Sequence, residues 1–99
     1  MKVGIVTGGN RGIGFEVVRG LLRESDLECI VVCSRSIENG VKAIESMRCE
    51  FGNRVDACEV AQLELSDAKS IETFVDWFKA YLAKHIFTIY NRVEGKTKK

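Results

Sequence analysis

The stretch Thr-Gly-Gly-Asn-Arg-Gly-Ile-Gly, residues 7–14, decides the fold. It follows a short apolar run at residues 3–6 and precedes a helical pattern that begins near Gly12. A strand that ends in a glycine-rich turn and leads into a helix directs backbone N–H groups outward, and the helix dipole favours a negative charge there. The stretch therefore predicts a phosphate-binding turn between a first strand and a first helix.

Each glycine of the turn has its own expected role. Gly8 allows a tight turn, Gly12 lets a pyrophosphate approach the backbone, and Gly14 lets the helix pack closely on the strand. The spacing Gly-x-x-x-Gly-x-Gly is neither the general dinucleotide fingerprint nor a P-loop, because no Gly-Lys-Ser/Thr follows. A turn that merely connects strand and helix is the alternative, and the strand–turn–helix context favours a nucleotide site.

Composition limits the classes of protein to consider. Ninety-nine residues suffice for one compact domain, and 45% apolar with 29% charged residues is typical of a globular protein. A net charge of +1 argues against a nucleic-acid partner. Four cysteines without zinc-site spacing indicate reduced thiols packed in a core. With no apolar run long enough for a membrane span or a signal peptide, we expect a cytoplasmic protein without a membrane partner.

Strand and helix patterns alternate along the chain. Strands are expected at residues 2–7, 29–33 and within 54–65, and helices at 12–24, from Ser36 to about residue 52, and after Ser66 or Asp67. This order predicts an α/β fold, the N-terminal half of a Rossmann-type doubly wound parallel sheet, β-α-β-α-β-α. Phe74, Trp77 and Phe78 are assigned to packing.

The last part of the chain has a different character. Residues 85–90 have the composition of a fourth strand, and the polar residues that follow predict a disordered tail. The expected division is a dinucleotide-binding half-domain at 1–84 and a divergent tail at 85–99.

The end of the second strand, Cys33-Ser34-Arg35-Ser36, indicates which cofactor is preferred. An acidic residue there selects NAD, whereas an arginine accommodates the additional phosphate of NADP. Arg35 presents a forked cationic donor set, and Arg11 adds a second cation before the first helix. Each arginine alone can be a solvated surface charge; together they favour NADP over NAD.

These motifs resemble the short-chain dehydrogenase/reductase family, and within it the NADPH-dependent carbonyl reductases, over residues 2 to about 84. The likeness lies in residues 7–14, Ser34-Arg35, residues 62–64 and Ser70-Ile71. Glu64 stands where the family usually has the aspartate that contacts the adenine edge together with the backbone that follows. The cofactor-binding residues that the resemblance implies are Gly8, Asn10, Arg11, Gly12, Ile13, Gly14, Arg35, Glu64 and Leu65.

The implied activity is hydride transfer from NADPH to a ketone, aldehyde or quinone, with a small-molecule carbonyl as substrate. The family's proton donor is a tyrosine with a lysine four residues later, and this sequence lacks that pair. Tyr81 and Lys84 are three apart, with Tyr81 on a buried stripe, so no catalytic residue is assigned. We therefore expect this chain alone to be inactive, as a truncated or alternatively ended product or an incomplete gene model.

Two other functions remain open from the sequence. The chain can be a non-catalytic nucleotide-binding or interaction fragment that associates through an exposed sheet edge. Another nucleotide-using Rossmann protein, such as an epimerase, shares the glycine turn, although Arg11 and Arg35 speak against it.

Overall fold

A computed structural model describes residues 2–97, with side chains described for residues 2–84. Three parallel strands, β1 (Val3–Thr7), β2 (Cys29–Ser34) and β3 (Cys58–Gln62), form one sheet in the order β1-β2-β3. The helices are α1 (Gly12–Glu24), α2 (Ile37–Ser46), α3 (Arg48–Phe51), the 3-10 turn η1 (Gly52–Ala57) and α4 (Ala68–Thr97). The predicted α/β class with alternating strands and helices is confirmed.

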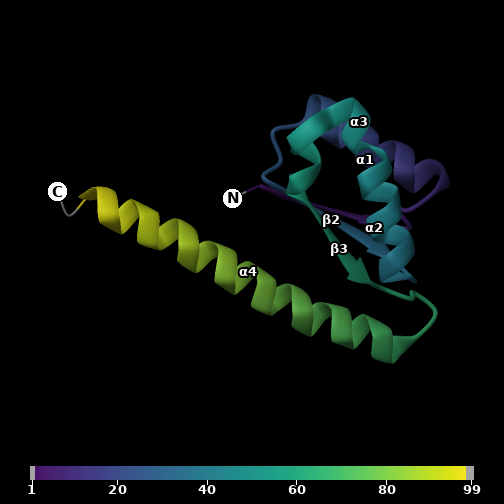
Figure 1. Cartoon of the computed structure of the whole chain (residues 1–99). Helices are drawn as coiled ribbons and strands as arrows, with labels where there is room; N and C mark the ends of the chain where they lie inside the picture. Colours follow the sequence, from purple (N-terminus) through teal and green to yellow (C-terminus); the bar gives the residue numbers. More distant parts are fainter. Residues whose placement is uncertain (1, 98–99) are drawn as a thin grey trace.

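The central strand β2 is buried along its whole length, as expected of its continuous apolar run. Its successive side chains enter opposite cores, because side chains alternate across a strand. Figure 1 shows α1, α2 and α3 on one face of the sheet and α4 on the other. The first core contains Val6, Val18, Leu22, Ile30, Val32, Ile44, Met47 and Val55.

The second core lies between the sheet and α4. Cys29, Val31 and Cys33 of β2 meet Ala61 and Leu63 there. Four aromatic side chains of α4 cover them, namely Phe74, Trp77, Phe78 and Tyr81. The assignment of Phe74, Trp77 and Phe78 to packing is thus confirmed.

Short polar side chains cap the starts of two helices near the carboxyl edge of the sheet. The Ser36 hydroxyl accepts a hydrogen bond from the Asn39 amide at 3.2 Å at the start of α2. Asp67 likewise accepts from the Lys69 amide at 3.0 Å before α4. The second predicted helix is shorter than expected: α2 ends before the buried cap residue Met47, and the chain continues through α3 and η1.

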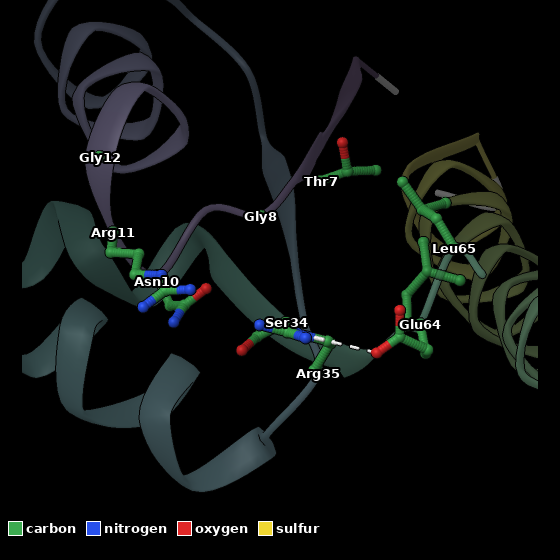
Figure 2. A pocket seen from close by; sticks show the side chains of 10 residues that line it. Thr7, Gly8, Asn10, Arg11, Gly12, Ser34, Arg35, Glu64 and Leu65 are labelled. Carbon is green, nitrogen blue, oxygen red and sulfur yellow. Dashed lines mark ion pairs between the residues drawn. The ribbon is translucent and has the colours of Figure 1, made fainter. Parts of the chain in front are cut away.

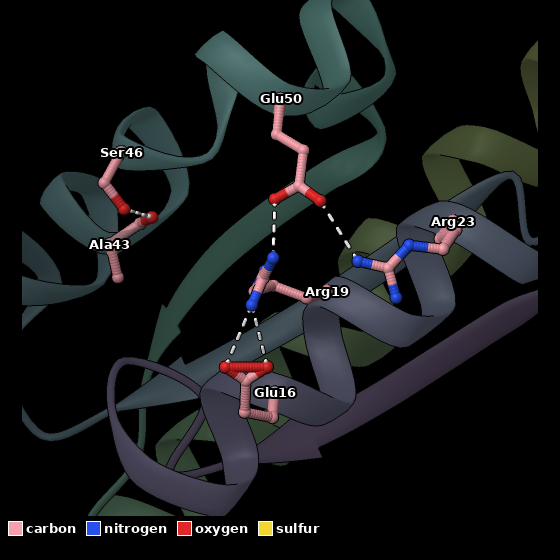
Figure 3. A network of polar contacts seen from close by, with 6 residues as sticks. All are labelled: Glu16, Arg19, Arg23, Ala43, Ser46 and Glu50. Atoms are coloured by element: carbon pink, nitrogen blue, oxygen red, sulfur yellow. Dashed lines mark hydrogen bonds and ion pairs between the residues drawn. The ribbon is translucent and has the colours of Figure 1, made fainter.

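Helix α3 is joined to α1 by a cluster of exposed ion pairs. Glu50 accepts hydrogen bonds from Arg19 at 2.8 Å and from Arg23 at 3.0 Å, and Arg19 also contacts Glu16 (Figure 3). These pairs hold the carboxylate of Glu50 ionised, and the Arg19 contact is the largest cause of the lowered Glu50 pKa. Exposed pairs of this kind contribute little to stability, so the two cores carry the fold.

The predicted fourth strand at residues 85–90 is wrong, because these residues belong to α4, which continues to Thr97. No glycine or proline interrupts the chain from Ala68 to Glu94, and extending a formed helix costs less than starting a new element. The helix also includes residues 91–97 of the predicted tail, whereas residues 98–99 lie outside the described residues. The division at residue 84 stays a prediction. Among the described residues, no helix has the length and apolarity that crossing a membrane requires.

Candidate functional site

A cleft of about 470 Å³ lies at the carboxyl ends of the three strands. This edge is where ligands bind in open parallel sheets with helices on both faces. The cleft is bounded by the turn before α1, the end of β2 and the segment after β3 (Figure 2). Its lining residues are Thr7, Gly8, Asn10, Arg11, Gly12, Ser34, Arg35, Leu63, Glu64 and Leu65.

The turn before α1 is built by glycines with different surroundings. Gly8 and Gly12 both have φ of +62°, and a Cβ at either would meet no atom within 4 Å. Their backbone therefore adopts a left-handed conformation and faces open space at the cleft. At Gly14, by contrast, a Cβ would lie 2.2 Å from the Gly8 carbonyl oxygen. The start of α1 thus packs directly on the turn.

Helix α1 begins at the cleft without a capping side chain. Arg11 is its N-cap residue and makes no side-chain cap hydrogen bond, and the first turn contains no acidic residue. The first N–H groups of a helix lack intrahelical partners and carry the positive end of its dipole. This end of α1 is therefore suited to an anion, with the exposed Arg11 beside it.

The opposite wall of the cleft joins the ends of β2 and β3. Leu63 donates its amide hydrogen to the Ser34 carbonyl at 2.9 Å, and the Gln62 side chain donates to the Arg35 carbonyl at 3.3 Å. The Arg35 side chain approaches Glu64, with Nε 3.7 Å from Oε2. Figure 2 shows Glu64 on the side of the cleft away from Arg11 and Asn10, with Arg35 between them. One cation and one carboxylate thus share this wall.

A smaller hollow of about 130 Å³ adjoins the cleft between the turn and the start of α2. It is lined by Asn10, Arg11, Ser34, Arg35, Ser36 and Asn39. The hollow therefore brings together the two arginines that the sequence singled out and adds the N-terminus of α2. The predicted site does not include Asn39. Its position in the first turn of α2, the helix that follows Arg35, is the signal that could have identified it.

Seven of the nine predicted residues line the cleft, and Ile13 and Gly14 do not. Ile13 is 86% exposed and lines a separate surface hollow with Phe15 and Val17. Thr7, Ser34 and Leu63 line the cleft as well, and each is the last residue of its strand or close to it. Strand ends at the carboxyl edge would have indicated them. A role in cofactor binding stays a prediction for all of these residues.

Tyr81 lies in the second core, away from the lining of the cleft. Its hydroxyl is 2.8 Å from the Cys29 sulfur. Burial, and secondarily this contact, raise the Tyr81 pKa above its ordinary value. A tyrosine that donates a proton beside a lysine needs the opposite shift, so these surroundings do not suit Tyr81 to proton transfer.

Comparisons with known proteins show the family to which this chain belongs. The sequence profile described as short chain dehydrogenase matches residues 2–93, past the point near residue 84 where the motifs end. A (+)-neomenthol dehydrogenase of Arabidopsis thaliana is 32% identical over 83 residues, which are 84% of this chain and 27% of that protein.

Two solved structures are similar over most of this chain. The menthone neomenthol reductase from Mentha piperita has a TM-score of 0.70 at 31% identity, covering 80% of this chain and 27% of its own. An alcohol dehydrogenase from the archaeon Thermococcus sibiricus, complexed with 5-hydroxy-NADP, has a TM-score of 0.61 at 29% identity, covering 79% and 31%. The chain spans about a quarter of the length of the curated relatives it matches. By its profile match and its fold, the chain belongs to the short-chain dehydrogenase family.

Proposed function

We propose that these residues form the NADPH-binding part of a short-chain oxidoreductase of the carbonyl reductase type. The observation that carries the proposal is the hollow where Arg11, Arg35 and the N-terminus of α2 converge beside the glycine turn. Two cations and a helix N-terminus at one small hollow suit a phosphate group. The similar Thermococcus sibiricus enzyme, solved with 5-hydroxy-NADP, supports a nicotinamide dinucleotide as the ligand.

In this proposal each part of the cleft holds one part of the cofactor. The uncapped start of α1 and the open backbone of Gly8 and Gly12 bind the pyrophosphate. Arg11 and Arg35 bind the phosphate on the adenosine ribose. Leu65, which is 63% exposed at the cleft, offers an apolar surface to the adenine. When bound, NADPH supplies the hydride for reduction of a ketone, aldehyde or quinone.

The reaction itself is proposed for the whole protein. The fourfold longer relatives include dehydrogenases and reductases of small carbonyl compounds or alcohols by name. This sequence has no tyrosine with a lysine four residues later, so we expect these 99 residues alone to be inactive. A cytoplasmic location, and the lack of nucleic-acid and membrane partners, remain predictions from the sequence.

The preference for NADPH is tested by titrating the chain with NADPH and NADH. Arg35→Asp is expected to abolish the preference, because a carboxylate repels the phosphate and accepts hydrogen bonds from a free ribose. Arg11→Ala is expected to reduce it in part. Lys2→Ala is the control, since Lys2 is an exposed cation at the amino end of β1, paired with Asp26. Equal binding of the two cofactors by the wild-type chain would contradict the proposal.

A second candidate function is association through the edge of the sheet. In the part of the chain that the structure describes, β1 pairs with β2 alone, and Ile5 of β1 is 46% exposed. Ile13 and Val17 of the adjoining α1 are exposed as well. Open edges beside apolar side chains invite pairing with another chain. Light scattering of the chain mixed with a full-length short-chain reductase tests this: separate species at micromolar concentration would rule it out.

A further inference from the structure

Arg35, one of the two cations on which the proposed NADPH preference rests, is already paired with a carboxylate of the same cleft. Arg35 Nε lies 3.7 Å from Glu64 Oε2, and the two side chains are 67% and 37% exposed. Figure 2 shows the pair across the wall formed by the ends of β2 and β3. An anion that binds the Nε side of the Arg35 guanidinium therefore approaches Glu64 too.

Two serines that follow β3 hold Glu64 in this position. Its other carboxylate oxygen, Oε1, accepts a hydrogen bond from the Ser66 hydroxyl at 2.9 Å. Its amide hydrogen is donated to the Ser70 hydroxyl at 2.9 Å, in the first turn of α4. Glu64 thus presents one oxygen to Arg35 while both its backbone and its second oxygen are fixed by neighbouring serines.

We propose that Glu64 is a specificity-determining residue that limits the preference of this cleft for 2′-phosphorylated adenosine by competing for Arg35. This inference rests on the NADPH proposal. A 2′-phosphate that binds the guanidinium must displace or lie beside the carboxylate, and like charges at short range repel. A free 2′-hydroxyl meets no such repulsion, because a carboxylate can accept its hydrogen bond. Arg35 therefore favours the phosphorylated ribose, and Glu64 favours the unphosphorylated one.

The test compares adenosine 2′,5′-bisphosphate with 5′-AMP, which differ only in the 2′-phosphate. Dissociation constants for the full 99-residue chain are measured by NMR titration at fixed, low ionic strength, because salt screens exposed charges. Glu64→Gln retains the side-chain length and an oxygen for the Ser66 hydroxyl. It is expected to increase the preference for the bisphosphate by about two- to fivefold, the range typical of an exposed ion pair.

Two controls separate a local effect from a change in total charge. Glu28→Gln removes an exposed carboxylate just before β2, at the opposite end of the sheet, and should leave the preference unchanged. Arg35→Gln should abolish the effect of Glu64→Gln, because two residues that act on each other give non-additive changes. Glu64→Asp provides a second variant, in which the shortened carboxylate withdraws from Arg35; it should increase the preference less than Glu64→Gln does.

The possible results distinguish this inference from the NADPH proposal. A wild-type preference for the bisphosphate that Glu64→Gln leaves unchanged or lowers would overturn the role of Glu64 and leave the NADPH proposal standing. Equal binding of both nucleotides by the wild type and by Glu64→Gln would overturn the two together. An increase with Glu64→Gln that persists in the Arg35→Gln background would show that Glu64 acts without Arg35, against the proposal.

Discussion

Two glycines of α1 have opposite surroundings. A Cβ at Gly14 would lie 2.2 Å from the Gly8 oxygen, whereas a Cβ at Gly20 would meet no atom within 4 Å. Gly14→Ala should therefore push α1 away from the turn and destabilise the chain by about 1–3 kcal/mol. Gly20→Ala should stabilise it by about 0.5–1 kcal/mol, because alanine is the better helix former. Urea unfolding of both variants checks this pair; a loss of stability in Gly20→Ala comparable to that in Gly14→Ala would contradict it.

The sequence was most informative about the individual residues of the site. Glycine and arginine spacing predicted the turn and both cations, because those residue types are needed locally for left-handed backbone and for phosphate. The pairing of Arg35 with Glu64 could not be predicted from spacing. It joins the ends of two strands and depends on how β2 and β3 align, with Ser34 opposite Gln62 in the register.

At the scale of elements, Arg54 of η1 closes the end of α1. Its guanidinium donates to the backbone carbonyls of Leu22 at 3.3 Å, Ser25 at 3.0 Å and Leu27 at 3.0 Å. The last carbonyls of a helix lack intrahelical partners, so this one side chain satisfies groups at the helix end and in the loop to β2. The third strand is expected only somewhere within residues 54–65, and no sequence pattern there indicates the carbonyl contacts that Arg54 makes.

Arg54→Lys should be costly although it conserves the charge. An ammonium group lacks the planar fork that reaches three carbonyls, and we expect a loss of about 2 kcal/mol in unfolding free energy. Arg48→Lys is the matched control, because Arg48 contacts only exposed carboxylates, Glu45 and Asp56, among the interactions described for it. Chemical denaturation of the two variants is the measurement; equal losses would show that the carbonyl contacts of Arg54 add nothing.

Helix α4 shows where element prediction from sequence fails. Ile, Phe and Tyr at residues 86–90 favour a strand, yet strand preference depends on a neighbouring strand and on burial. The continuous helix to Thr97 has no such requirement. The apolar stripes of these helices are also wider than their buried faces, since Ile71 and Val75 of α4, and Ile37 and Val41 of α2, are exposed. Periodicity gives the side of a helix that is apolar, whereas the width that is covered depends on the neighbouring elements.

At the scale of the whole molecule, thiols in both cores couple stability to alkaline pH. Burial raises the pKa of Cys33, in the second core, to about 11 and that of Cys58, packed against the first core, to about 11, from an ordinary value of 9.0. Between pH 9 and about pH 11, these thiols lose their protons in the unfolded chain and keep them in the folded chain. The thiols' contribution is therefore complete below about pH 9 and is lost as the pH rises towards 11.

Stability should accordingly fall between pH 9 and 11, and each of these two thiols should account for part of the slope. Urea unfolding of the reduced chain at intervals across this range gives the dependence. Cys33→Ala and Cys58→Ala should each flatten the curve relative to the wild type, whatever their offset at pH 8, because each removes one group that titrates differently in the two states. Cys49→Ala, which removes an exposed thiol, controls for the substitution itself. The ionisable groups other than the substituted thiol are the same in every variant, so the comparison lies in the difference between slopes. Parallel curves for the wild type and both core variants would mean that the two cores admit solvent to their thiols in the folded state, and the two-layer packing around β2 would then be looser than the contacts in the structure imply.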